Sequence, residues 1–183
     1  MTRDAAATRA RILTAATAEF AAHGLAGGRV DRIAQQAATN VRMIYAYFGA
    51  KEGLFDAALA SALTRLAETL PPRPDDLAAW AGDVFDFHLA DPSTLRLSLW
   101  AQLERPAAAQ EPLASYRAKV AALTGATPVD AVDLLVLIYA MAQAWFLSPS
   151  GLLGADGGDP TRPARIAAHR AGVVAAVERL IAS

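Results

Sequence analysis

The stretch AATNVRMIYAYFGAKE, from Ala37 to Glu52, constrains the fold of this chain more than any other segment. Ile44 and Phe48 lie four residues apart within it, the spacing of two side chains on the buried side of a helix. Thr39 or Asn40 can cap this helix at its start, and a glycine follows Phe48 at its end. Another helix begins almost at once, so the stretch predicts the second half of a helix-turn-helix.

Helical periodicity continues along the rest of the chain, and no convincing alternation of apolar and polar residues marks a strand. The first helix is expected over 5–23 and ends at Gly24, where a left-handed cap fits. A short second helix carries on one face Val30, Ile33, Ala34 and Ala37. Further helices are expected over 51–70, 75–90, 93–104, 114–123, 129–147 and 162–181, with a loop over 148–160. The predicted fold class is all-α.

Composition excludes several classes of protein. Hydrophobic residues make up 54% of the chain, which is typical of a folded protein. The chain has no cysteine, so disulfides and thiolate chemistry are excluded, which is compatible with a reducing cytosol. The N-terminus shows no signal-peptide pattern, and the most apolar stretch, 134–147, is too short to span a bilayer. We therefore expect a cytoplasmic protein that does not enter the membrane.

Charge is distributed unevenly along the chain. Residues 1–53 hold seven Lys and Arg against four Asp and Glu, a net charge of +3, whereas residues 54–183 hold ten against fourteen, a net charge of −4. A basic N-terminal part on an acidic body suits a protein that presents one end to DNA. We expect a helix-turn-helix DNA-binding domain over 1–53 and a second helical domain over 54–183.

A recognition helix enters the major groove of DNA with its N-terminal residues, which here are Asn40, Val41, Arg42 and Met43. The Arg42 guanidinium matches guanine O6 and N7, and both Val41 and Met43 offer apolar contact to a thymine methyl. Asn40 has two interpretations, since its side chain can cap the helix or bind adenine.

Candidates for phosphate contacts follow in Tyr45, Tyr47 and Lys51. The tyrosine hydroxyls can donate to phosphate oxygens, and Lys51 lies in the first turn of the next helix, where free backbone N–H groups also attract anions. The alternative is that the tyrosine rings belong to the core and that Lys51 is an ordinary solvated lysine.

Three motifs carry a resemblance to a known family: IL-x-AA-x-x-x-F with HG after it, V-x-x-IA-x-x-A, and IY-x-YF-x-x-KE-x-LF. From about Arg9 to Phe55 the chain resembles the N-terminal domain of the TetR (tetracycline-repressor) family of transcriptional regulators. The resemblance implies base contacts by Val41, Arg42 and Met43 and phosphate contacts by Arg29, Tyr45, Tyr47 and Lys51. Gly28 and Arg29 replace the usual Ser/Thr cap of the second helix, and Ala38-Thr39 replaces the usual Gly-Val turn. An operator sequence therefore does not carry over from relatives.

Dimerisation is expected because one half-site rarely gives enough affinity for a specific DNA sequence. The apolar helices over 129–147 and 162–181 are the candidate dimer contacts, and the resemblance implies a four-helix bundle built from two such pairs. The alternative is that both helices pack within one subunit.

Aromatic residues are dense in the middle helices and are accompanied by two polar side chains, which together suit a small-molecule pocket. The candidate ligand-binding residues are Trp80, Phe87, His88, Trp100, Tyr116, Tyr139 and Gln143. The alternative is that they are large core residues. The aromatic residues suit an apolar or aromatic effector. The resemblance implies that an effector shifts the helix over 51–70 and releases the operator, with repression as the usual mode.

Two other classes of protein remain as alternatives. An enzyme could use Asp83, Asp86 and His88, but the two acids share one helix face while His88 points elsewhere, and no nucleophile motif occurs. We therefore expect no catalytic, metal or cofactor site. A helical protein-interaction scaffold is the second alternative, and salt-dependent binding to duplex DNA distinguishes it from a regulator.

Overall fold

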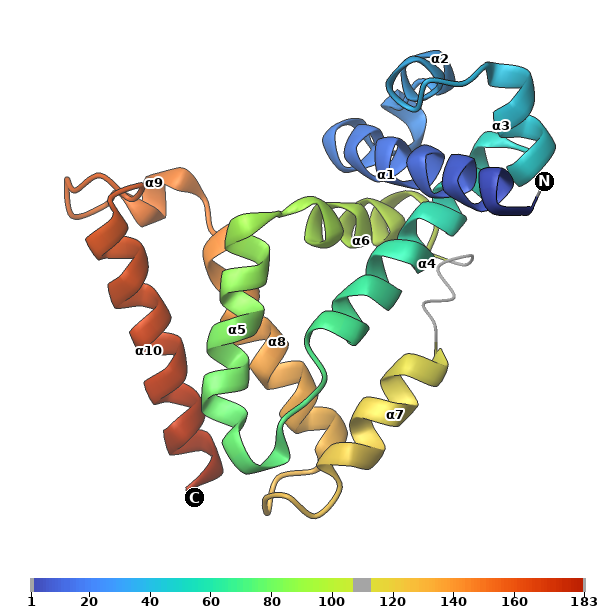
Figure 1. Ribbon diagram of the computed structural model, residues 1–183. Coiled ribbons are helices and arrows are strands. Elements are labelled where there is room, and N and C mark those ends of the chain that lie inside the picture. The colour runs from blue at the N-terminus through green and yellow to red at the C-terminus, as the bar shows by residue number, and fades with distance from the viewer. Residues whose placement is uncertain (1, 107–112, 183) are drawn as a thin grey trace. The chain divides into compact units, whose positions relative to one another are not determined.

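The computed structural model describes residues 2–106 and 113–182, and all regular structure in these ranges is helical (Figure 1). The elements are α1 (Thr2–Gly27), α2 (Val30–Gln36), α3 (Val41–Phe48), α4 (Lys51–Thr69), the 3-10 turn η1 (Pro74–Asp76), α5 (Leu77–Ala90), α6 (Ser93–Glu104), α7 (Leu113–Leu123), α8 (Ala131–Leu147), α9 (Ser150–Leu153) and α10 (Pro163–Ile181). The predicted all-α fold is confirmed.

Local chemistry explains where these helices begin. The Asp130 carboxylate accepts a hydrogen bond from the Val132 amide at 2.8 Å, so α8 starts after this cap and not at residue 129. The segment over 148–160 was predicted to be a loop, but part of it forms the short helix α9. Pro149 precedes this helix, and its carbonyl accepts from the Leu152 and Leu153 amides.

The helices form two units. The first contains α1 to α4 together with α6, and the second contains η1, α5 and α7 to α10. The chain passes from the first unit to the second after Thr69 and returns after Asp91. This division differs from the expected boundary between residues 53 and 54, because α4 and α6 pack against the helix-turn-helix itself. The division between DNA binding over 1–53 and effector binding over 54–183 stays a prediction.

The core of the first unit is built from apolar residues spaced three or four apart on α1, α4 and α6. Phe20 and Phe55 are fully buried and meet edge to face, with ring centroids 5.1 Å apart. Ile33 of α2 and Ile44 of α3 close this core from the helix-turn-helix side. The orientation of α3 is therefore set by apolar burial beneath it.

The second unit has a separate core between α5, α8 and α10. Its central members are Trp80, Phe85, Leu134, Ile138, Val173 and Val177. The Trp80 indole N–H donates to the Leu70 carbonyl at 3.2 Å, which satisfies its polar group inside the core. Within the described residues no helix is long and apolar enough to cross a membrane.

Candidate DNA-binding surface

Helix α3 presents one buried side and one exposed side. Ile44 is fully buried and Phe48 is half-buried, whereas Met43, Tyr45 and Tyr47 are 41%, 43% and 36% exposed. Arg42 is also exposed, and Val41 is half-buried against the core. The tyrosine rings are therefore not enclosed in the core, and the N-terminal part of α3 offers its side chains to solvent.

The start and the end of α3 are defined by side-chain and backbone capping. The Asn40 side-chain oxygen Oδ1 accepts from the Met43 amide at 2.8 Å, so the capping interpretation of Asn40 is confirmed. Gly49 ends the helix with a φ of 74°, and its amide donates to the Tyr45 carbonyl. Helix α3 is consequently a short helix of about two turns with a cap at each end.

Helix α2 is held at its start by a buried carboxylate from α1. Glu19 accepts from the Arg29 amide at 2.8 Å and from Nε and Nη2 of Arg32 at 2.9 and 2.5 Å. Burial acts to raise the pKa of Glu19, but hydrogen bonds from Arg32 and from the Arg29 backbone outweigh it and hold the pKa below its usual value. Glu19 thus binds the amide of Arg29, the N-cap residue of α2, whose own side chain makes no cap hydrogen bond. The sequence feature that could have revealed this role of Glu19 is an acidic residue next to Phe20, within the apolar stripe of α1.

The turn between α2 and α3 departs from the geometry that most residues adopt. Ala38 has a φ of 49°, in the left-handed region that favours glycine. Arg11 of α1 steadies this turn, because its Nε donates to the Ala37 carbonyl at 3.2 Å. A second arginine of α1, Arg9, places its guanidinium 5.4 Å from the centroid of the Phe48 ring. Sequence reasoning singled out neither arginine.

Two of the expected phosphate contacts already have protein partners. Arg29 pairs with Asp31 at 2.9 Å on the surface, and the hydrogen bond from Arg29 holds the pKa of Asp31 below its usual value. Lys51, at the start of α4, donates from Nζ to the Ala26 carbonyl at 3.2 Å. Both cations therefore lie near the α1–α2 turn, where they contribute to local structure as well as to charge.

The expected effector-binding residues fall into both units. Trp100 belongs to α6 and packs in the first unit, where its indole lies against Gly24. The other six residues lie in the second unit. There the rings of Trp80 and Tyr139 meet at 5.9 Å, and the Tyr139 hydroxyl accepts from Nζ of the buried Lys119 at 2.6 Å. Lys119, which also lies 5.8 Å from the Tyr116 ring centroid, was missed because a lone lysine in a helix resembles a surface residue.

His88 is the most deeply buried polar member of this set, at 1% exposure. Its Nε2 lies 3.4 Å from the amide nitrogen of Gln143, and its Nδ1 has no hydrogen-bond partner among the described residues. Burial lowers the pKa of His88 to about 4, against a smaller opposing effect of Asp91, so the ring is neutral at pH 7. The rings of Phe87 and Phe146 flank it at 5.5 and 6.0 Å.

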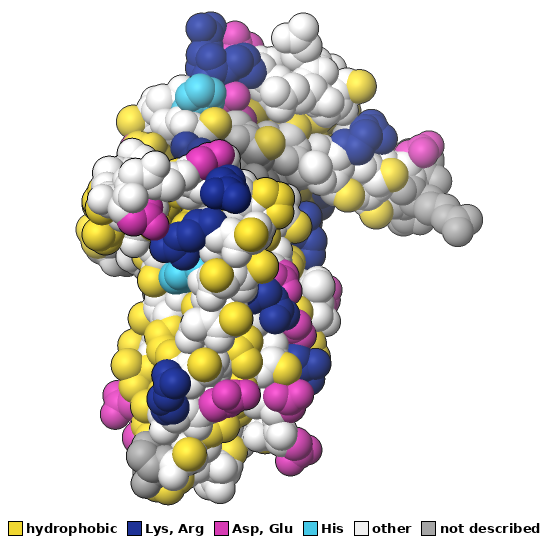
Figure 2. All heavy atoms as spheres, turned by 90° about the vertical axis from the view of Figure 1, so that its left-hand side faces the viewer, with side chains coloured by type: hydrophobic (Ala, Val, Ile, Leu, Met, Phe, Trp, Pro, Cys, Tyr) yellow, Lys and Arg dark blue, Asp and Glu magenta, His cyan; other side chains and the backbone are white. Residues whose placement is uncertain are grey.

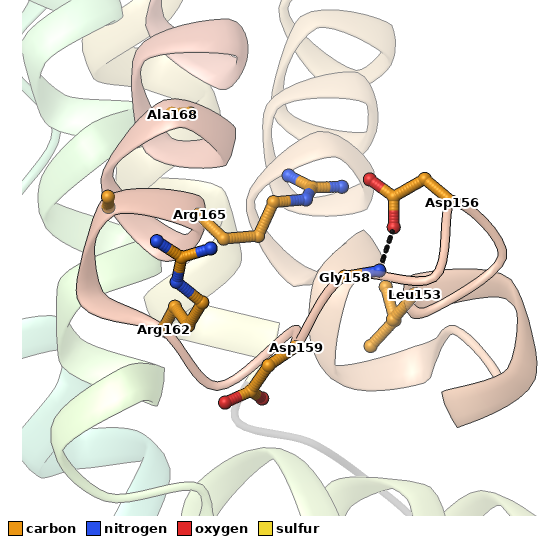
Figure 3. Close-up of a pocket in the computed structure, with 8 residues that line it drawn as sticks. Leu153, Asp156, Gly158, Asp159, Arg162, Arg165 and Ala168 are labelled. Atoms are coloured by element: carbon orange, nitrogen blue, oxygen red, sulfur yellow. Dashed lines mark hydrogen bonds between the residues drawn. The ribbon is translucent and has the colours of Figure 1, made fainter.

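A surface pocket of about 310 Å³ lies elsewhere in the second unit, between the loop after α9 and the start of α10 (Figure 3). Its wall is formed by Leu153, Asp156, Gly158, Asp159, Arg162, Ala164, Arg165 and Ala168. None of the expected effector-binding residues lines it. Arg165 also lies over the Trp145 ring at 4.9 Å. The predicted effector-binding residues therefore do not share this pocket.

The acids considered for an enzyme site are engaged in ion pairs. Asp86 accepts from Arg170 Nε at 2.7 Å, and Asp83 pairs with Arg73 at 2.5 Å and with Arg170 at 3.6 Å. His88 is buried apart from them. Across residues 4–106 and 116–182, no group of three or more histidines and acids is placed to hold a metal ion. The acids link α10 to α5 on the surface.

Comparison with known proteins agrees with this geometry. Residues 12–58 match the family of "Bacterial regulatory proteins, tetR family", and residues 76–179 match "Tetracyclin repressor-like, C-terminal domain". The HTH-type transcriptional repressor SCO4008 of Streptomyces coelicolor is 44% identical over 77% of this chain and 79% of its own length. The HTH-type transcriptional repressor NicS of Pseudomonas putida is 52% identical over 26% of this chain and 23% of its own length.

Solved structures show the same fold. The transcriptional regulator SCO4942 of Streptomyces coelicolor superposes with a TM-score of 0.80 at 37% identity, over 94% of this chain and 97% of that one. A TetR family transcription regulator from Marinobacter aquaeolei superposes with a TM-score of 0.67 over 96% and 98% of the two chains. At 20% identity this second likeness concerns the fold alone.

Proposed function

The chain belongs to the TetR family of DNA-binding transcriptional regulators, and on that premise we propose that it is a cytoplasmic homodimeric repressor released from its operator by a small-molecule effector. The repressor role is supported by the name of the relative SCO4008, which is itself called a repressor. Dimerisation and effector release are typical of the family.

The exposed side of α3 carries the proposal. Arg42 and Met43 are exposed on its first turn, and Tyr45 and Tyr47 follow on its second, while Ile44 anchors the helix from below. Exposed large apolar side chains that gather on one short helix are typical of a surface that a partner covers. A two-turn helix with an arginine on its first turn fits the major groove, where guanine presents two acceptors.

Phosphate contacts are supported by the residues around this helix. The start of α4 carries Lys51, and the free N–H groups of its first turn attract anions. Arg29 is exposed, so a phosphate could share it with Asp31. Tyr45 and Tyr47 extend hydroxyls from the exposed side of α3. We assign these four residues to backbone contacts, which position the helix without reading sequence.

Dimerisation is supported by apolar side chains that the second unit leaves exposed. On α8 they are Val132, Val136, Leu137 and Leu147. On α10 the exposed positions include Ala164, Ala167, Ala168, Ala171 and Gly172. Figure 2 shows hydrophobic side chains interspersed with charged ones on the face that includes α10. Because small residues let two helices approach closely, we propose that 129–147 and 162–181 pair with a second copy through a two-fold axis.

The effector is proposed to bind in the second unit near His88 and Gln143. The unpartnered Nδ1 of His88 supports a ligand that is mainly apolar or aromatic and carries one hydrogen-bonding group. Phe87, Tyr116 and Tyr139 are half-buried and can contribute apolar walls. Such a ligand releases DNA only as far as it binds the two conformations unequally, and a coupling of about 1–3 kcal/mol corresponds to a roughly 5–150-fold change in affinity.

The first test is binding of the purified protein to duplex DNA from upstream of its own gene, against unrelated duplex of the same length. We expect tighter binding to the upstream duplex. We also expect the logarithm of the affinity to fall linearly with the logarithm of the salt concentration, since phosphate contacts release counterions. Equal affinity for both duplexes, or no dependence on salt, would contradict the proposal and favour a protein-interaction scaffold.

A further inference from the structure

We propose that Glu104, at the end of α6, is a positioning residue for DNA recognition that holds the turn between α1 and α2 in place. The proposal rests on the DNA-binding function given above. Glu104 lies far along the chain from the helix-turn-helix, within the stretch that matches the C-terminal family domain. The structure nevertheless places α6 in the first unit, packed along α1 and α4 (Figure 1).

The Glu104 carboxylate binds two backbone amides of this turn. Its Oε2 accepts from the Leu25 amide at 2.5 Å, and the Ala26 amide lies 3.3 and 3.4 Å from its two oxygens. The carbonyl of Ala26 itself accepts from Lys51 Nζ at 3.2 Å. A carboxylate from α6 and an ammonium from α4 therefore hold the two residues that follow the break in α1.

The break itself explains why these amides need a partner. Gly24 has a φ of 69° and a ψ of −177°, which interrupts α1 and removes the regular acceptors of the next amides. A Cβ at Gly24 would lie 2.9 Å from Glu104 Oε1 and 2.9 Å from the Trp100 ring, so α6 covers the break at close range. The Leu25 amide is part-buried, where an N–H group without an acceptor is costly, and hydrogen bonds to a charged group are the stronger kind.

A neighbouring ion pair extends the attachment. Arg105 pairs through Nη2 with Asp56 of α4 at 3.0 Å. The end of α6 is thus joined to the α1–α2 turn by Glu104 and to α4 by Arg105. Helix α2 begins four residues after Ala26, and α3 packs on α2, so a shift of the turn changes the presentation of Arg42 and Tyr45.

The test compares Glu104→Ala and Glu104→Gln with wild type, with Gln102→Ala as the matched control, since Gln102 is exposed on the same helix. Affinity for the upstream duplex and for unrelated duplex is measured together with hydrogen exchange of the α1–α2 turn, α2 and α3. We expect Glu104→Ala to lose about tenfold or more in operator affinity, which is the size of a charge-assisted hydrogen bond. Glu104→Gln retains an acceptor and should recover part of this loss.

Hydrogen exchange decides the proposal independently of DNA. In Glu104→Ala we expect faster exchange in the α1–α2 turn, α2 and α3, with α5, α8 and α10 unchanged. Wild-type exchange in these segments would overturn the proposal, and so would equal acceleration in all helices, which would indicate a general loss of stability. If wild type does not distinguish the two duplexes, the proposed function fails, whereas wild-type affinity of Glu104→Ala overturns only the role of Glu104.

Discussion

Glu19 and Arg32 form an ion pair in which the carboxylate is almost completely buried and the guanidinium is not. Arg32 donates to Glu19 Oε1 from both Nε and Nη2, and the Arg29 amide donates to the same oxygen at 2.8 Å. The side chain of Glu19 is 3% exposed, against 40% for Arg32. This pair links α1 to the first turn of α2 and so sets the geometry of the helix-turn-helix.

Removal of the carboxylate should destabilise the first unit. Glu19→Ala leaves the Arg29 amide without its acceptor and Arg32 without its counter-charge, which we expect to lower the free energy of unfolding by about 2–3 kcal/mol. Thermal and urea unfolding measure the change. Glu68→Ala, which removes an exposed acid from α4, is the control and should stay within about 0.5 kcal/mol of wild type. An equal small effect of both substitutions would contradict the role given to Glu19.

The pH dependence of stability should reveal the buried His88. Its pKa is lowered to about 4 from the usual 6.5, so the unfolded chain binds a proton that the folded chain excludes. The contribution of His88 to the free energy of unfolding is therefore fully present above about pH 6.5. It falls as pH decreases toward 4, by about 1.4 kcal/mol per pH unit between these values. Urea unfolding at pH 7.0, 6.0 and 5.0 measures the slope.

His88→Gln is the matched variant for this slope, because it keeps a polar side chain without a titrating ring. We expect the variant to lose most of the slope between pH 7 and 5, and the remainder to come from His169, whose pKa burial and the charge of Arg165 also lower. Glu19 does not add to the slope between pH 7 and 5, since the stability that it contributes is lost only as pH falls from its usual pKa of 4.5 through its lowered folded pKa. A wild-type slope in His88→Gln would show that another group titrates.

The helices were predictable because each follows from neighbouring residues. Apolar spacing on α1 and α4, a cap at Asn40 and a glycine after Phe48 are local signals, and the structure follows them closely. The substitution of Ala38 for the usual glycine was visible too, and its φ of 49° shows that the turn keeps its geometry without that glycine.

The contacts that hold the helix-turn-helix were not predictable, because they join residues far apart along the chain. Glu104 and Leu25 are 79 positions apart, and no spacing rule relates them. The same holds for Arg105 and Asp56, which are 49 positions apart. Trp100 was grouped with six residues of the second unit, but α6, which carries it, packs on α1 in the first unit. Periodicity shows which face of a helix is apolar and not which element covers that face.

Arg42 should determine DNA specificity, whereas Lys51 should contribute to affinity for any duplex. We expect Arg42→Ala to weaken the upstream duplex by about 1–3 kcal/mol and unrelated duplex much less, because base contacts carry the discrimination. Lys51→Ala should weaken both duplexes similarly and reduce the salt slope by about 1. Arg96→Ala removes an exposed arginine from α6 and is the charge-matched control. Equal weakening of both duplexes by Arg42→Ala would contradict its assignment as a base contact.

The exposed apolar side of α8 should determine the oligomeric state. Val136 is 59% exposed, and a lysine there would place a charge in the proposed contact between two copies, where burial without a partner is costly. We expect Val136→Lys to sediment as a monomer under conditions where wild type is a dimer, and to lose at least about tenfold in operator affinity because only one half-site is bound at a time. Leu152→Lys, at a 66% exposed position of α9, is the control and should remain dimeric. A monomeric wild type, or a dimeric Val136→Lys with full operator affinity, would show that α8 does not pair the two copies.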